Sequence, residues 1–173
     1  FSDTITGGVV PKTYIQSVET GIRDYLKSGP LGFPVVDVAV NLSDGSYHAV
    51  DSSDMAFQMA AKLAMKEGMA ACSPVLLEPV MKVEIVTPSD ATSRIIALIP
   101  QRRGQILGYD ARPDWPGWDV VEATMPQAEI GDLIIELRSA TAGVASYRAS
   151  FDHMAELTGR LAEEAMNANG KAA

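Results

Sequence analysis

The chain contains few of the residues that build disulfides, metal clusters or membrane spans. It has one cysteine, Cys72, and two histidines, His48 and His153, so a disulfide, a zinc cluster and a Cys-His catalytic pair all lack the groups they need. It also has no run of about 18 apolar residues, the length that a membrane-spanning helix requires. The N-terminus lacks a basic region followed by an apolar stretch. We therefore expect a cytoplasmic protein that has no metal site and does not contact a membrane.

Sequence motifs of common enzyme classes are missing as well. There is no Gly-x-x-x-x-Gly-Lys-Ser/Thr phosphate loop, no Gly-x-Gly-x-x-Gly and no Gly-x-Ser-x-Gly elbow. Carboxylates cluster only as near neighbours, Asp51 with Asp54 and Glu163 with Glu164, which is typical of a helix start and of a solvated helix face. The sequence predicts no catalytic residue and no enzymatic activity of this chain by itself.

The charge balance limits the kind of partner. The chain of 173 residues has 14 basic and 22 acidic residues and a net charge of −8, which argues against a nucleic-acid binder held by bulk electrostatics. Any RNA contact has to be local and shape-driven. With 47% hydrophobic residues, the chain is expected to fold as one large or two small domains.

The first part of the chain predicts two helices but only one good strand. Apolar spacing predicts a helix over residues 11–27, and a β-branched, alternating pattern predicts a strand over 34–41. A second helix is predicted over 53–70, with Ser53 among its N-cap candidates. Since one strand cannot make a sheet, either residues 2–10 supply another strand or the chain begins inside a domain, as a fragment does.

The second part predicts a complete β-α-β-β-α-β unit. Ser73 and Pro74 break the helical pattern, residues 75–79 are predicted as an extended connector, and we place a domain boundary at residue 73. The unit is predicted to contain a strand at 80–86, a Ser-capped helix at 89–99, strands at 105–112 and 118–124, a helix at 128–138 and a strand at 145–151. A last helix over 158–166 and a frayed tail over 167–173 follow.

A loop with a histidine connects the predicted strand at 34–41 to the helix that follows. Its candidate contact residues are Gly45, Ser46, Tyr47 and His48. A turn at Asp44-Gly45 places these side chains at one end of the packed unit. A lone loop histidine is most often solvated, and no second group for catalysis lies nearby in the sequence. The pattern favours contact over chemistry at this loop.

Basic residues end both helices of the second unit. Arg102 and Arg103 follow the first helix, and Arg138 and Ser139 end the second. These residues are candidates for phosphate contacts, although basic residues at a helix C-terminus are also expected from the helix macrodipole alone. Trp115 and Trp118 flank a Pro-Gly turn, where an aromatic side chain either stacks on a base or partner or packs over the hairpin.

An ordered set of motifs resembles the C-terminal portion of bacterial translation elongation factor G. The set comprises Gly7-Gly8-Val9-Val10-Pro11, Gly45-Ser46-Tyr47-His48, Val50-Asp51-Ser52-Ser53, residues 74–84, Arg102-Arg103-Gly104-Gln105 and Leu137-Arg138-Ser139. The resemblance runs over nearly the whole chain, and several motifs in the right order are more specific than any one of them.

The resemblance implies an α+β fold in two domains. Residues 1–73 would be the later part of domain IV, a truncated unit like the second domain of ribosomal protein S5. Residues 74–173 would be domain V, a ferredoxin-like β-α-β-β-α-β sandwich with a C-terminal helix and tail. The GTPase domain, which binds GTP and magnesium in the family, would lie outside this chain, so no cofactor is expected here.

The resemblance also implies a function on the ribosome. In the family, the full protein is a GTPase that moves tRNA and mRNA along the ribosome during elongation. The loop Gly45, Ser46, Tyr47 and His48 would approach tRNA and mRNA in the decoding centre, beside 16S rRNA. Domain V would lie near 23S rRNA and the ribosomal proteins of the stalk base, which makes Arg102, Arg103, Arg138 and Ser139 candidate rRNA contacts.

Departures from the family pattern leave two alternatives. Ala49 follows His48 where an acidic residue is usual, residues 140–145 lack the usual basic residues, and residues 130–133 replace a Met-Phe-Gly-Tyr run. These changes suggest an elongation factor G-like paralogue that acts in ribosome recycling, specialised translation or ribosome protection. An alternative of another class is a ferredoxin-like regulatory or ligand-binding module that dimerises through its sheet.

Overall fold

The computed structural model describes residues 1–170 and shows two compact units. Unit 1 comprises residues 1–76 together with the chain from residue 158 onward, and unit 2 comprises residues 77–157. The chain therefore leaves unit 1, forms unit 2 and returns to unit 1. Within the described part, no helix combines the length and apolarity needed to cross a membrane.

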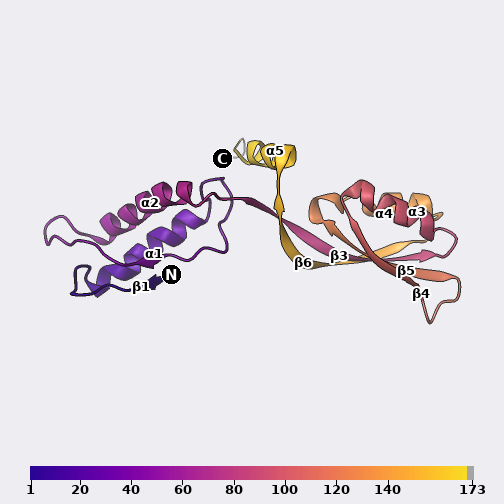
Figure 1. Ribbon diagram of the computed structural model, residues 1–173, viewed down its shortest axis with the longest axis horizontal. Coiled ribbons are helices and arrows are strands. Elements are labelled where there is room, and N and C mark those ends of the chain that lie inside the picture. Colours follow the sequence, from indigo (N-terminus) through magenta and orange to yellow (C-terminus); the bar gives the residue numbers. More distant parts are fainter. Residues whose placement is uncertain (171–173) are drawn as a thin grey trace. The chain divides into compact units, whose positions relative to one another are not determined.

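Unit 1 is built on a pair of helices. Its elements are β1 Ser2–Asp3, α1 Lys12–Leu26, β2 Asn41–Leu42, α2 Asp54–Ala71 and α5 Gly159–Gly170. Helices α1 and α2 lie side by side (Figure 1). They bury a shared apolar cluster of Val18, Ile22, Ala61, Met65 and Met69. Both helices were predicted, and the cap at Ser53 is confirmed, because its Oγ accepts the N–H of Ala56 at 3.2 Å.

The strand predicted over residues 34–41 is wrong except at its end. Only Asn41 and Leu42 form a strand, which pairs in parallel with Ser2 and Asp3. Asp37 has a φ of 55°, in the left-handed region, and this conformation interrupts an extended strand. Of the two alternatives for a second strand, residues 2–10 do supply one, because Ser2 and Asp3 form β1.

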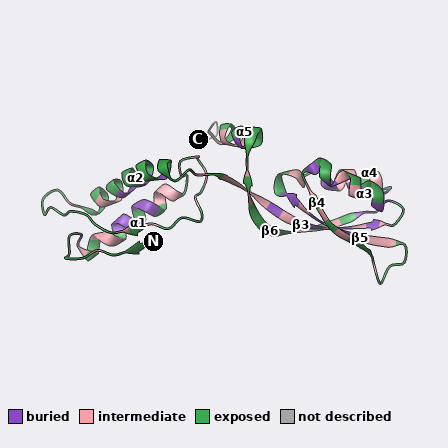
Figure 2. Cartoon of the chain, viewed as in Figure 1, coloured by how far each residue is buried: buried purple, intermediate pink, exposed green. Residues whose placement is uncertain are grey.

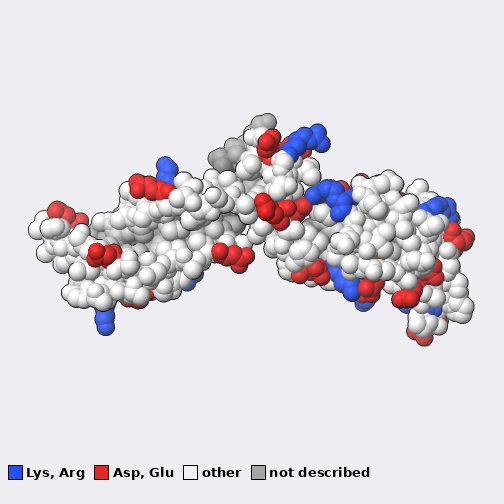
Figure 3. Space-filling model, viewed as in Figure 1, with Lys and Arg blue, Asp and Glu red and all other residues white. Residues whose placement is uncertain are grey.

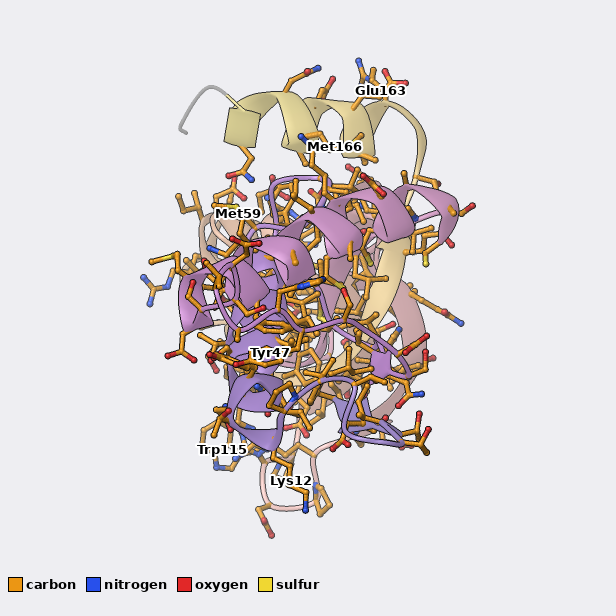
Figure 4. The ribbon with its side chains drawn as sticks, turned by 90° about the vertical axis from the view of Figure 1, so that its left-hand side faces the viewer. Lys12, Tyr47, Met59, Trp115, Glu163 and Met166 are labelled. Carbon is orange, nitrogen blue, oxygen red and sulfur yellow. The ribbon has the colours of Figure 1, made fainter. Side chains whose placement is uncertain are left out.

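Helix α5 completes unit 1. The side chain of Asn169 donates a hydrogen bond to the carbonyl oxygen of Gly32, Ala162 is buried and Met166 is half-buried. Figure 4 shows Met166 on the side of α5 that faces α2. The predicted last helix is confirmed, but it continues to Gly170 through part of the predicted frayed tail. Residues 171–173 of that tail lie outside the described residues.

Unit 2 has the predicted β-α-β-β-α-β order. Its elements are β3 Leu76–Pro88, α3 Thr92–Leu98, the 3-10 turn Pro100–Arg102, β4 Gln105–Ala111, β5 Trp118–Pro126, the 3-10 turn Gln127–Glu129, α4 Leu133–Ala140 and β6 Ser146–Leu157. The strands form one sheet in the order β4-β5-β3-β6, the ferredoxin-like arrangement. The predicted fold class is therefore confirmed.

Alternation along β3 and β5 separates the two faces of this sheet. Val83, Ile85 and Val121 are fully buried, and Figure 2 colours the buried positions purple. These residues form one core with Ile95 of α3, Leu133 of α4 and five others. Since side chains alternate between the faces of a strand, the residues between them point to the opposite face, away from the helices.

Several predicted bounds in unit 2 are wrong for identifiable reasons. The predicted connector 75–79 is mostly strand, since β3 begins at Leu76. A proline is tolerated at position 79 on the β5 side, because β5 pairs with β3 only from Val80 onward and no N–H of residue 79 has to donate to β5. Helix α3 starts at Thr92 without a side-chain cap. Ser89, the predicted cap, instead donates its hydroxyl to Asp119 at 2.7 Å. The predicted helix 128–138 is a 3-10 turn followed by α4.

Candidate functional site

The loop over residues 43–53 connects β2 to α2 and carries the first set of predicted contact residues. Gly45, Ser46, Tyr47 and His48 are all exposed, and they lie on consecutive positions without helix or strand. The exposed fraction of Tyr47 is 42%, so part of its ring is held by neighbours and part is free. The loop is therefore a surface element with both aromatic and imidazole groups available for contact.

Aromatic packing ties this loop to both helices. The ring centroid of Tyr14, in the first turn of α1, lies 5.8 Å from that of Tyr47. Tyr14 also stacks on Phe57 of α2, with centroids 4.7 Å apart. Figure 4 shows Tyr47 among the side chains of this end of unit 1. Sequence reasoning missed Tyr14, although aromatic residues in the first turns of both predicted helices were a usable signal.

Backbone hydrogen bonds fix the turn that presents His48. The N–H of His48 donates to Ser52 Oγ at 3.0 Å, and the N–H of Ser52 donates back to the carbonyl oxygen of His48 at 2.9 Å. The two bonds close a ring of backbone around the tip, while the imidazole itself remains exposed. This geometry orients His48 outward without using its ring nitrogens.

Gly45 is required by a close approach to the start of α1. A Cβ at this position would lie 2.4 Å from Cγ2 of Val10, which is far inside van der Waals contact. Behind the loop, Gly45 and Ser46 line a mostly apolar cavity of about 350 Å³ together with residues of α1 and α2. A larger residue at position 45 would therefore move the loop away from the helices.

Arg102 is placed inside unit 2 rather than on its surface. Only 7% of it is exposed, and its guanidinium donates to Asp132 at 2.7 Å, to Glu136 and to the carbonyl oxygen of Glu129. Hydrogen bonds to Glu136 and then to Asp132 raise the pKa of Arg102 above its ordinary value. Its contacts join the turn after α3 to the start of α4.

Arg103 is also held by carboxylates. Its φ is 53°, and its guanidinium binds Glu78 through two parallel hydrogen bonds of 2.7 and 2.9 Å. A third bond, from Nε to Glu129, measures 3.0 Å. Hydrogen bonding to Glu78 raises the pKa of Arg103 above its ordinary value. No local pattern indicates that these particular acids pair with Arg102 and Arg103, because all four partners are at least 25 positions away.

Arg138 and Ser139 occupy the last turn of α4 and are exposed. The carbonyl oxygen of Arg138 accepts the N–H of Gly143 at 2.8 Å, which closes the helix end. Among the described residues, the Arg138 guanidinium makes no ion pair. Within residues 1–170, Arg138 and Ser139 are thus the two of the four predicted rRNA contacts whose side chains have no hydrogen-bond or ion-pair partner, and contact with rRNA stays a prediction for all four.

Residues 1–170 contain no group of three or more His, Cys, Asp or Glu side chains arranged to hold a metal ion. Exposed basic and acidic side chains are interspersed over the face drawn in Figure 3. Of the predicted contact residues, all except Arg102 are exposed.

Comparison with known proteins identifies both halves of the chain. Residues 1–73 match the family model of elongation factor G, domain IV, and residues 75–165 match that of the elongation factor G C-terminus. The chain is 58% identical, over 162 residues and 94% of its length, to an elongation factor G-like protein of Synechocystis sp. (strain ATCC 27184 / PCC 6803 / Kazusa). A crystal structure of a protein from Thermus thermophilus matches 99% of the chain with a TM-score of 0.88 and 38% identity.

The folds and the matches define a pair of translation-factor domains, and in this family these two domains carry no catalytic site. The chain belongs to the elongation factor G family. It spans about a quarter of the length of its relatives, 24% of the Synechocystis protein and 26% of the Thermus chain.

Proposed function

We propose that this chain is the ribosome-binding C-terminal part of a translational GTPase, and that its loop 43–53 contacts tRNA and mRNA during translocation. The observation that carries the proposal is the loop itself: an exposed Tyr47 and His48 on a backbone that aromatic packing and the His48-Ser52 hydrogen bonds hold rigid. A preorganised loop loses little conformational entropy when it enters a narrow site.

The charge of the chain fits a contact of this kind. Because the net charge is −8, long-range attraction to RNA is weak, and binding has to come from shape and from a few local groups. His48 and Tyr47 supply hydrogen-bonding and stacking groups that need no positive field. Membership of the elongation factor G family supports the ribosome as the partner, with GTP and magnesium bound by a GTPase domain of the full-length protein.

A specific observation favours a second candidate, an elongation factor G-like paralogue in ribosome recycling or ribosome protection. Ala49 stands beside His48, so the tip lacks an acidic group at the position where the family usually has one. The Synechocystis relative carries the name elongation factor G-like protein. The two candidates share ribosome binding and differ in the reaction that the full-length protein promotes.

The loop can be tested by substitution at its tip. In the full-length protein, His48→Ala is expected to slow translocation, measured by toeprinting on ribosomes with a bound tRNA, by about tenfold, the equivalent of one or two lost hydrogen bonds. Met59→Ala is the control, because Met59 lies on α2 outside the loop and is 54% exposed.

The same pair of variants separates the candidates. A slower rate of subunit splitting in His48→Ala, with translocation absent from the unmodified protein, assigns the chain to recycling. Ribosome co-sedimentation, translocation and splitting that are all equal in His48→Ala, Tyr47→Ala and the unmodified protein would remove the loop from the mechanism.

A further inference from the structure

A second cavity lies on the helix-free face of the sheet in unit 2. It has a volume of about 360 Å³ and is lined by Glu84, Val86, Arg112, Val120, Ser146, Tyr147 and Arg148. Val86 and Val120 are paired directly across β3 and β5, and they alternate with the buried residues of the core. The floor of the cavity is therefore the outer face of the sheet. Its polar side chains include Arg112, which follows β4, and Arg148 of β6.

Two guanidinium groups define the chemistry of this cavity. Arg148 donates from Nε and Nη2 to a single oxygen, Oε2 of Glu84, and within residues 1–170 its Nη1 has no hydrogen-bond partner. The side chain of Arg148 is 78% exposed. The guanidinium of Arg112 makes no ion pair with a described residue and instead lies 3.9 Å from the centroid of the Trp115 ring. The cavity thus has two cations, one carboxylate and N–H donors available for an anion.

An exposed aromatic ring, Trp115, lies against Arg112 just outside the residues that line the cavity. Trp115 is 48% exposed and packs edge-on against Trp118, with centroids 5.5 Å apart. Both belong to the β4-β5 hairpin, whose turn extends beyond the sheet in Figure 1. Guanidinium groups that bind phosphate next to a flat aromatic surface are the combination that recognises single-stranded nucleic acid.

We infer that this cavity binds an unpaired nucleotide of RNA, with a phosphate between Arg112 and Arg148 and the adjoining base stacked on Trp115. The inference rests on the proposed function, since it gives unit 2 an RNA contact on the ribosome. It also explains how a chain of net charge −8 binds RNA, because the cavity sets two guanidinium groups against one carboxylate and so carries a local excess of positive charge. An acidic peptide would supply carboxylates for the two guanidinium groups, but its acidic side chains do not stack on the aromatic ring.

The chain supplies its own reporter for the experiment. It has two tryptophans, and both lie at this hairpin, so tryptophan fluorescence reports on the hairpin beside the cavity. We expect a short oligouridylate to quench this fluorescence in a saturable way. Arg112→Gln with Arg148→Gln should weaken binding and lower the slope of log affinity against log salt by about one for each lost phosphate contact. Trp115→Ala should weaken binding by about tenfold with the slope unchanged.

Controls separate the site from general charge and from folding. Arg94→Gln removes an exposed arginine from α3, on the helix side of the sheet, and should leave affinity and slope as in the unmodified chain. Arg112→Lys keeps the charge and the hairpin but loses the planar fork, so it should bind less tightly than the unmodified chain. Thermal unfolding of each variant checks that unit 2 remains folded.

Three results would overturn the inference. They are an oligouridylate that leaves the fluorescence unchanged, Arg112 and Arg148 variants that bind like Arg94→Gln, and a polyglutamate that quenches the fluorescence as strongly as the RNA. Co-sedimentation with ribosomes keeps the two proposals apart. A chain that binds ribosomes while its cavity ignores RNA refutes only the cavity, whereas a chain that does not bind ribosomes refutes the proposed function.

Discussion

Arg103 and Glu78 face each other in a two-pronged ion pair, with Nη1 to Oε1 at 2.7 Å and Nη2 to Oε2 at 2.9 Å. The pair connects the turn before β4 to the first residues of β3, and the Glu78 side chain is 15% exposed. Parallel hydrogen bonds of this kind are stronger than single ones, because both groups are charged and their planes match. The ion pair therefore holds the start of β3 against the turn before β4.

Breaking this pair should destabilise unit 2 measurably. We expect Glu78→Gln to lower the free energy of unfolding by about 1 kcal/mol, the upper end for partly exposed ion pairs. Urea denaturation monitored by tryptophan fluorescence measures the change. Glu122→Gln is the control, because Glu122 contacts Lys82 through one longer distance of 3.3 Å and is 44% exposed. An equal effect of the two substitutions would mean that the two-pronged geometry adds nothing.

The stability of unit 2 should depend more on the shape of the side chain at position 102 than on its charge. Arg102→Lys keeps the cation but cannot reach Asp132, Glu136 and the Glu129 carbonyl together, so we expect a loss of about 2 kcal/mol in unfolding free energy. Arg138→Lys, at an exposed position, should stay within about 0.5 kcal/mol of the unmodified chain. Calorimetry on both variants checks the difference, and equal melting temperatures would contradict it.

The crossing of α1 and α2 should reject any side chain at Gly21. A Cβ there would lie 2.4 Å from the Gln58 carbonyl oxygen, so Gly21→Ala is expected to cost about 1 to 3 kcal/mol despite the better helix propensity of alanine. Gly68→Ala is the matched control in α2, because nothing lies within 4 Å of the place that the new methyl group would take. It should gain about 0.5 to 1 kcal/mol. Circular dichroism during urea unfolding measures both, and a stabilised Gly21→Ala would refute the close packing.

Asp119 should make unit 2 sensitive to acid. Hydroxyl groups of Thr92 and then Ser89 donate to its carboxylate at 2.6 and 2.7 Å and hold its pKa below the ordinary value of 3.8. Because the folded pKa lies below the unfolded one, this stabilisation is complete above the unfolded pKa and is lost as pH falls through the folded pKa.

Asp119→Asn removes that titration. Its stability should therefore decline less steeply than that of the unmodified chain between about pH 5 and pH 2. Thermal unfolding across this range measures the two slopes. Asp114→Asn, in the turn of the same hairpin, controls for the lost charge. Parallel curves for Asp119→Asn and the unmodified chain would show that the hydroxyl groups do not stabilise the carboxylate.

The local sequence pattern was sufficient to predict an element where the residues that it marks as apolar are also the ones that pack in the core. Val18 and Ile22 recur at helical spacing and are buried against α2, and Ser53 caps that helix as its position indicates. In unit 2, the motif order indicated four strands and two helices because each element buries one regular face in a single core. These are the cases in which local propensity and tertiary contact agree.

One local backbone turn and several long-range contacts account for the failures. The valines near residue 36 alternate like a strand, yet Val36 is 58% exposed and Asp37 turns the chain. The predicted start of the helix at 128 is occupied by a turn, and the Glu129 carbonyl there accepts a hydrogen bond from Arg102. For the candidate site, exposure of Gly45 to His48 followed from the loop signals, but the pairing of Tyr14 with Tyr47 and the burial of Arg102 depend on residues far away in the sequence.

The return of the chain into unit 1 has a consequence for dissecting this protein. Helix α5 is attached to β6 of unit 2 but holds Gly32 of unit 1 through Asn169. A protease that cuts at the exposed residues Cys72 and Ser73 would therefore leave a nicked pair of polypeptides still joined by α5. A fragment of residues 77–157 contains unit 2 alone. A fragment that continues beyond Leu157 also contains α5, which is a helix of unit 1, and the apolar side of α5 is then uncovered.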